Sequence, residues 1–163
     1  MTVLAPDRTG IVQTLSLTVA ENGGNWLESR MARLAGQFAG IVRVEIEESQ
    51  AEALIKALST LEGISIQATV EGPDCEQERN HLTLDVVGND RPGIVKTLSS
   101  AIAGAGANLE DLHTSLESAP MAGHPLFHAK GIVSLPEALA PGALIAAIEA
   151  VGEDLNVTVG EPN

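Results

Sequence analysis

The residues with the clearest chemical potential lie in a short turn that the chain contains twice. Asp7-Arg-Thr-Gly10 and Asp90-Arg-Pro-Gly93 each precede a segment whose apolar spacing predicts a helix. The first amides of a helix lack intrahelical partners and carry the positive end of its dipole, so a carboxylate is a natural ligand there. Glycine lets a ligand approach the backbone, and proline presets φ just before the helix. The candidate ligand-binding residues of the two turns are Asp7, Thr9, Gly10, Ile11, Asp90, Pro92, Gly93 and Ile94.

The turn aspartates have two possible roles, and the turns also have a simpler interpretation. Asp7 and Asp90 could cap the helix amides or face the ammonium group of a ligand. The alternative for both turns is a well-made connection from strand to helix that binds nothing.

An asparagine follows each predicted helix, Asn25 in the first copy and Asn108 in the second. An amide both donates and accepts hydrogen bonds, so it could bridge the two ends of an amino acid; the alternative is an ordinary turn asparagine after glycine. The turn and the asparagine lie at opposite ends of a helix of roughly 12 residues, about 18 Å at 1.5 Å per residue. If the copies pair about a pseudo-two-fold axis, composite sites would combine Asp90–Gly93 with Asn25 and Asp7–Gly10 with Asn108.

These features recur because the chain is one unit written twice. Asp7–Ser16 returns 83 residues later as Asp90–Ser99, with eight of ten positions identical. The repeat predicts two domains of about 80 residues. The expected boundaries are a first domain at 1–72, a linker at 73–80 and a second domain at 81–160. Because the alignment places Met1 inside the first strand, we expect that strand to be shortened to Thr2–Ala5.

Each copy has the pattern strand–helix–strand–strand–helix–strand. The first helices should bury the stripes Ile11, Val12, Leu15, Val19 and Ile94, Val95, Leu98, Ile102. The other expected elements are strands at Asn25–Leu34, Phe38–Glu47, Ile64–Val70, Leu82–Val86, 108–117, from Phe127 and at Leu155–Val159, and helices at Gln50–Leu61 and Pro141–Val151. A loop at Ala119–Pro125 is inserted in the second copy. The pattern predicts an α+β fold of two ferredoxin-like βαββαβ sandwiches, each an antiparallel sheet with its helices on one face.

Composition disfavours several classes of function. The net charge is −13, and Lys plus Arg against Asp plus Glu number 6 and 12 in residues 1–80 and 3 and 10 in residues 81–163. Neither half has a basic face for nucleic acid, and the outward strand positions lack the aromatic residues on which RNA-recognition domains stack bases. Neither a dinucleotide-binding nor a phosphate-binding glycine motif occurs, so no cofactor is expected.

Metal and nucleophilic chemistry are also disfavoured. His113, His124 and His128 surround the inserted loop without a carboxylate or cysteine at ligand spacing, so no metal site is expected. The serines lack a nucleophile motif. The single Cys75 excludes an intramolecular disulfide. No secretory signal or apolar run of about 20 residues is present, so a cytoplasmic location without membrane association is expected.

The order of elements, the repeated Asp-Arg-x-Gly-Ile-Val turn and the Asn-x-x-Glu/Asp start of the second strand resemble the ACT domain family. Leu126–Ala129, Leu135-Pro136 and Asp154–Val157 extend this similarity through the second copy. The resemblance implies small amino acids, glycine or serine, bound at ACT–ACT interfaces. Thr9, where the family commonly has proline, and the short first strand make the first copy the weaker candidate.

Two functions remain open. The first, favoured by the resemblance, is a non-catalytic regulatory protein that binds a small amino acid and acts in trans. Its protein partner would be a transcription activator of glycine catabolism or a metabolic enzyme. The second is a protein-interaction or oligomerisation module without a ligand. A homodimer is expected in either case because edge strands remain available.

Overall fold

The computed structural model describes residues 1–72, 80–118 and 125–161 of the 163-residue chain. It separates into two compact units, Met1–Cys75 and Glu76–Asn163, and each is described by itself. Most of the expected linker, most of the inserted loop, and Cys75 and His124 lie outside the described residues. Asn80, expected to end the linker, instead begins a strand.

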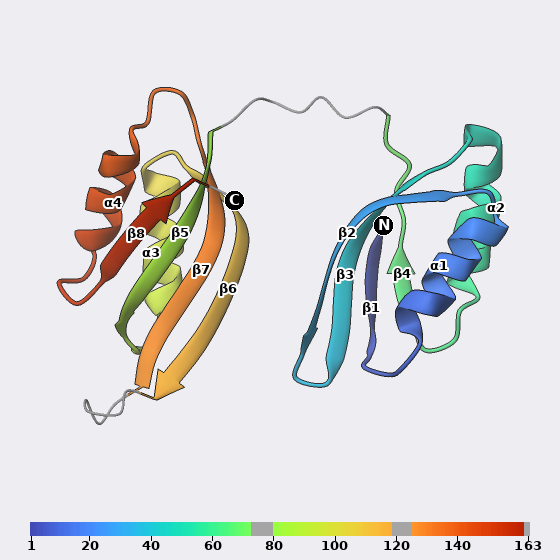
Figure 1. The fold of residues 1–163 in the computed structure, drawn as a ribbon, viewed down its shortest axis with the longest axis horizontal. Coiled ribbons are helices and arrows are strands. Elements are labelled where there is room, and N and C mark those ends of the chain that lie inside the picture. The colour runs from blue at the N-terminus through green and yellow to red at the C-terminus, as the bar shows by residue number, and fades with distance from the viewer. Residues whose placement is uncertain (73–79, 119–124, 162–163) are drawn as a thin grey trace. The chain divides into compact units, whose positions relative to one another are not determined.

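The first unit is a four-stranded antiparallel sheet in the order β2-β3-β1-β4, with both helices on one face (Figure 1). The repeat of alternating strands and amphipathic helices thus gives the expected ferredoxin-like sandwich. Its elements are β1 (Thr2–Pro6), α1 (Ile11–Glu21), β2 (Asn25–Leu34), β3 (Gln37–Glu45), α2 (Glu48–Ser59) and β4 (Ser65–Gln67).

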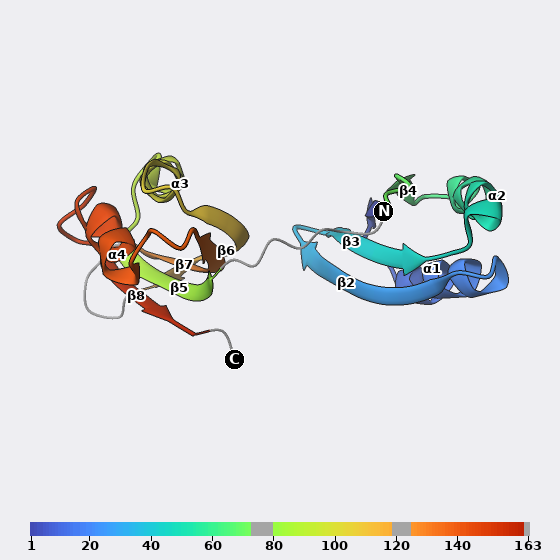
Figure 2. The same ribbon diagram turned by 90° about the horizontal axis from the view of Figure 1, so that it is seen from above.

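The second unit repeats this topology in the order β6-β7-β5-β8, and Figure 2 shows α3 and α4 together over one face of the sheet. Its first strand has ten residues where β1 has five. The elements are β5 (Asn80–Asn89), α3 (Ile94–Gly104), β6 (Asn108–Ser118), β7 (Pro125–Leu135), α4 (Pro141–Glu149) and β8 (Asn156–Gly160). The described helices have 9 to 12 residues, and none is long and apolar enough to cross a membrane.

Each unit has its own aliphatic core between its sheet and its helices. Leu15 and Val42 are at its centre in the first unit, and Leu98 and Val133 in the second. The predicted helix stripes were wrong at one position each, because Val12 is 46% and Val95 41% exposed. Both follow the first buried isoleucine directly, so they point about 100° around the helix from it, off the buried stripe.

Strand β4 is much shorter than the expected Ile64–Val70. Its partner is β1, and only Thr2–Leu4 pairs with it. A short first strand therefore limits the last strand, since the two lie side by side in the sheet. The second helices also begin and end up to two residues before the predicted bounds, a boundary error typical of pattern-based assignment.

Candidate functional site

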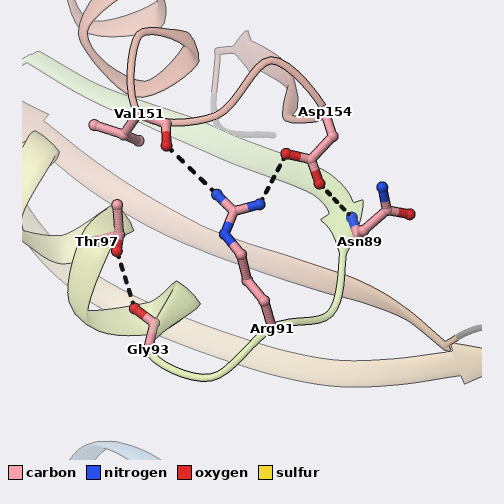
Figure 3. Close-up of polar contacts among 6 residues, drawn as sticks. All are labelled: Asn89, Arg91, Gly93, Thr97, Val151 and Asp154. Carbon is pink, nitrogen blue, oxygen red and sulfur yellow. Dashed lines mark hydrogen bonds and ion pairs between the residues drawn. The ribbon is translucent and has the colours of Figure 1, made fainter.

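Both repeated turns place their glycine in the left-handed region at the helix N-cap. Gly10 has φ 90° and Gly93 has φ 84°, values that other residues adopt only with strain. The carbonyl of Gly93 then accepts hydrogen bonds from the amide and the hydroxyl of Thr97, at 2.9 and 3.1 Å (Figure 3). The Gly10 carbonyl accepts the same pair from Thr14, at 2.9 and 3.0 Å. The glycine in Asp-Arg-x-Gly thus sets the direction in which each helix begins.

The starts of α1 and α3 are open to a ligand. Neither helix has a side-chain cap or an acidic residue in its first turn. Neither Asp7 nor Asp90 therefore caps its helix, and their proposed role toward a ligand stays a prediction. A Cβ built on Gly93 would meet nothing within 4 Å, and one on Gly10 would meet only the Gln13 side chain at 3.9 Å. The Ile94 amide already donates to the Arg91 carbonyl at 3.2 Å. The first-turn amides of α3 that can donate to an anionic ligand are therefore those that follow Ile94.

Arg91 fastens the second turn to the loop that follows α4 (Figure 3). Its Nη1 lies 2.8 Å from Asp154 Oδ1, and its Nη2 donates to the Val151 carbonyl at 3.4 Å. The other oxygen of Asp154 accepts the amide of Asn89 at 3.0 Å. The Arg91 guanidinium first, and the Asn89 amide second, hold the pKa of the Asp154 carboxyl below its usual value. This clamp joins the end of β5, the start of α3 and the α4–β8 loop.

The first unit keeps only part of this clamp. Arg8 Nη2 donates to the Glu62 carbonyl at 2.9 Å, and a Cβ on Gly63 would lie 3.8 Å from the same nitrogen. Gly63 thus stands where the second unit has Asp154. The carboxylate of Asp7 instead forms an ion pair with Nε of Arg33 on β2. The two turns therefore share a backbone geometry but differ in their charges.

The predicted turn residues divide into those that face outward and those that anchor the helix. Asp7, Thr9, Asp90, Pro92 and Gly93 are exposed, whereas Gly10 is half-buried. The isoleucines that follow the glycines are core residues: Ile11 is 3% and Ile94 5% exposed. Only the backbone of these two isoleucines can contact a ligand.

The asparagines are not brought to the turn of their own unit. Asn25 begins β2 and Asn108 begins β6, both exposed, at the far ends of α1 and α3. Each helix has 11 residues, which corresponds to about 16 Å. A small amino acid cannot span that distance. Each asparagine would therefore have to serve a turn other than its own.

A polar cluster that the sequence did not reveal lies beside Asn108. Ser134 is directly across the ladder from both Asn108 and His81. Its hydroxyl is buried and has no hydrogen-bond partner among the described residues. His81 Nε2 reaches Glu110 Oε2 at 3.0 Å, joining the two strands on either side of Ser134. No local sequence pattern indicates this cluster, because the residues come from three strands.

Comparisons with known proteins agree with this architecture. Residues 1–71 match the family model of the ACT domain. The crystal structure of an unknown protein from Galdieria sulphuraria is 32% identical, with a TM-score of 0.83 over 99% of this chain and 96% of that chain. The chain belongs to the ACT domain family. No curated protein sequence matches it.

This tandem ACT protein also shares its fold with a proposed glycine cleavage system transcriptional repressor. That crystal structure matches with a TM-score of 0.68 and 15% identity, over 99% of this chain and 95% of that chain. At this identity the likeness shows the fold alone. The match covers nearly all of both chains, so the fold is shared along the whole length of this chain.

His128 of the second ACT unit has polar contacts that the sequence did not indicate. His128 on β7 has carboxylates on both sides: Nδ1 lies 3.1 Å from Glu117 of β6, and Nε2 lies 2.8 Å from Asp85 of β5. Glu117 first and Asp85 second raise the pKa of His128, against desolvation and the nearby Lys130. These partners are 11 and 43 residues away in sequence, so a search for carboxylates at ligand spacing could not find them. Among the described side chains, no cluster of three or more His, Cys, Asp or Glu could hold a metal ion.

Proposed function

We propose that this tandem ACT protein is a non-catalytic cytoplasmic regulator that binds a small amino acid at the starts of its first helices. Ligand binding would alter its contact with a partner protein in trans. The single observation that carries the proposal is the uncapped start of α3, with open space above Gly93. A ligand carboxylate would accept hydrogen bonds from the first-turn amides and gain from the helix dipole.

The second ACT unit is the stronger candidate. The carboxylate of Asp90 has no hydrogen bond or ion pair with any residue in the described part of the chain, so it can face a ligand ammonium group. Asp7 is already paired with Arg33, which reduces its attraction for a second cation. The Arg91–Asp154 clamp also preorganises the second turn, and preorganisation lowers the entropy lost on binding.

We further propose that the asparagines complete the sites across paired copies of the ACT unit. Because Asn108 is a helix length away from Asp90–Gly93, the amide at that turn would come from Asn25, and the turn at Asp7–Gly10 would receive Asn108. The pairing could be within a chain or between two chains. In a two-fold arrangement each of the two composite sites would contain one turn and one asparagine, contributed by different copies.

The fold likeness to a proposed glycine cleavage system transcriptional repressor indicates which ligands to test first. We propose glycine or serine as the amino acid. The protein partner would be a transcription activator of glycine catabolism or a metabolic enzyme. No direct contact with nucleic acid is proposed, since the chain has a net charge of −13.

The test is calorimetric titration of the full chain with each of the twenty amino acids, followed by titration of variants. Asn25→Ala should weaken binding at the second turn at least tenfold, the loss of about 1.4 kcal/mol expected for one or two hydrogen bonds to a charged ligand. Asn156→Ala is the matched control, since Asn156 is also an exposed asparagine at a strand start. Unchanged affinity in Asn25→Ala would reject the composite arrangement, while leaving the turn itself as a site.

The alternative function is a protein-interaction or oligomerisation module without a ligand. It would be supported if none of the twenty amino acids binds and partner binding is indifferent to all of them. That result would also overturn the regulatory proposal.

A further inference from the structure

The face of the first sheet that lies opposite its helices exposes an unusual amount of apolar surface. Leu34 is 80%, Ile41 64% and Leu4 51% exposed. Ala39 of β3 is also exposed, and it lies directly between Ala32 of β2 and Leu4 of β1 in the register. These five residues therefore form one contiguous patch, which we call the β2-β3-β1 patch.

The second sheet provides an internal comparison, because four of the five positions there are polar and only that of Leu4 stays apolar, as Val87. Strand pairing places Glu117 where the first unit has Leu34, and Lys130 where it has Ile41. In the same way His128 takes the position of Ala39, and Ser115 that of Ala32. The second ACT sheet thus folds with ionisable side chains at three of these positions, those of Leu34, Ala39 and Ile41. The apolar residues at the four positions of the β2-β3-β1 patch other than that of Leu4 are therefore not required by the fold, and a function can explain their exposure.

We propose that the β2-β3-β1 patch binds the same patch of a second copy of this chain. Contiguous exposed apolar surface of this kind marks interaction sites in soluble proteins. A two-fold axis through the patch would bring each apolar residue against apolar residues of the other molecule, as self-complementary interfaces require. This inference does not depend on amino-acid binding.

Charge favours a second copy as the occupant. The charged residues on this face are Glu28, Arg30, Arg43 and Glu45, two acidic and two basic. Arg43 Nη1 lies 3.4 Å from Glu28 Oε1, so part of this charge is already paired. The face is therefore neutral although the chain carries −13, and two copies can approach through it without the repulsion that acts elsewhere.

A strongly charged sheet face would be a poor occupant. A face such as that of β5, β6 and β7 would bring Asp85, Glu117 and Lys130 against leucine and isoleucine. Removing such charges from water costs several kcal/mol each unless they keep good partners. An apolar, neutral face avoids this cost, and the patch of a second copy is such a face.

The size of the face indicates a modest, reversible dimer. The strands β2, β3 and β1 have 10, 9 and 5 residues. With strands about 4.8 Å apart and a rise of about 3.4 Å per residue, they cover roughly 400 Å² in projection. Interfaces of this order are at or below the standard size for stable complexes. We therefore expect dissociation at low micromolar concentration, not an obligate dimer.

The experiment is sedimentation equilibrium of the full chain at about 1–200 µM, without amino acids. The wild type should rise from 16.9 kDa toward twice that mass. The variant Ala39→His/Ile41→Lys, which introduces the residues of the second sheet, should remain at the mass of one chain over the same range. Leu17→Lys is the matched control, since Leu17 on α1 is 52% exposed and lies outside the patch; it should dimerise like the wild type.

Two results would overturn the proposal. One is a wild-type chain that stays at the mass of one chain throughout, which would assign the patch to a different partner. The other is a patch variant that dimerises as tightly as the wild type. Circular dichroism and thermal unfolding of each variant establish that the fold is retained, which the second sheet leads us to expect. Since the measurement contains no amino acid, its failure would leave the ligand proposal standing, and failure of ligand binding would leave the dimer standing.

Discussion

Substitution of Gly93 by alanine tests whether the left-handed turn defines the start of α3. At φ 84° an alanine places its Cβ too close to the following carbonyl oxygen, which costs roughly 1–2 kcal/mol. The added Cβ would meet nothing within 4 Å, so no clash with neighbouring residues increases this cost. For a domain of about 80 residues, in which 1 kcal/mol lowers Tm by about 4–8 °C, the expected fall in Tm is about 4–16 °C.

The assay is differential scanning calorimetry of the full chain. Gly104→Ala is the matched control, because Gly104 is the last residue of the same helix and its Cβ would also meet nothing within 4 Å. It should leave Tm unchanged or raise it by the equivalent of up to about 1 kcal/mol, since alanine favours the helix. Gly93→Asn should lose less than Gly93→Ala, because asparagine adopts the left-handed region more readily.

A matched change in the first unit extends the test. Gly10 has φ 90°, so Gly10→Ala should lower the stability of that unit by a similar amount. If Gly93→Ala unfolded at the same temperature as Gly104→Ala, the turn would tolerate a side chain. The argument that glycine is needed for the backbone conformation would then be refuted.

Three further predictions concern the second ACT unit. Because the pKa of His128 is raised, its protonated form stabilises the fold below its unfolded pKa of about 6.5, and this contribution is lost as pH rises through the higher folded pKa. His128→Gln should therefore lower Tm by about 2–4 °C at pH 6, which corresponds to about 0.5 kcal/mol for the lost ion pair, and by less at pH 8.5. His113→Gln is the control. A difference in Tm between His128→Gln and the wild type that is the same at both pH values would contradict this. Gly131→Ala should lower the free energy of unfolding by about 3 kcal/mol or more, because its Cβ would lie 2.2 Å from the Asp111 carbonyl oxygen. The measurement is urea unfolding of both variants. The control Gly142→Ala, whose Cβ would meet nothing within 4 Å, should leave the free energy of unfolding nearly unchanged. Asp154→Asn removes the charge that holds Arg91 and should weaken amino-acid binding at the second turn in calorimetry, while binding at the first turn stays the same.

The duplication made the fold predictable, because the same order of strands and helices could be identified in both copies of the sequence. Asn25–Leu34 was predicted with its bounds, since a helix-ending glycine precedes it and a tight turn follows it. The length of β4 was not predictable from its own residues, because it depends on how much of β1 is available to pair. The length of a strand in a sheet thus depends on its neighbouring strand as well as on its own residues.

The candidate site was predictable only in its local part. The glycine turn could be identified because its conformation depends on four consecutive residues. The clamp was missed although Asp-Arg occurs in both turns, because the partner of Arg91 is 63 residues away. The carboxylates beside His128 were missed for the same reason, since they are contributed by strands that are neighbours only in the folded sheet.

The most direct test of the central claim is the change in ¹H–¹⁵N chemical shifts of the labelled full chain during titration with glycine and serine. Binding of a carboxylate at the helix start predicts the largest shifts for the amides of Gly93 to Lys96, with smaller ones at the corresponding amides of α1. The shifts should saturate, and Gly93→Ala should abolish them at α3. Saturable binding with its largest shifts elsewhere in the unit, and none at the first turn of α3, would contradict the account.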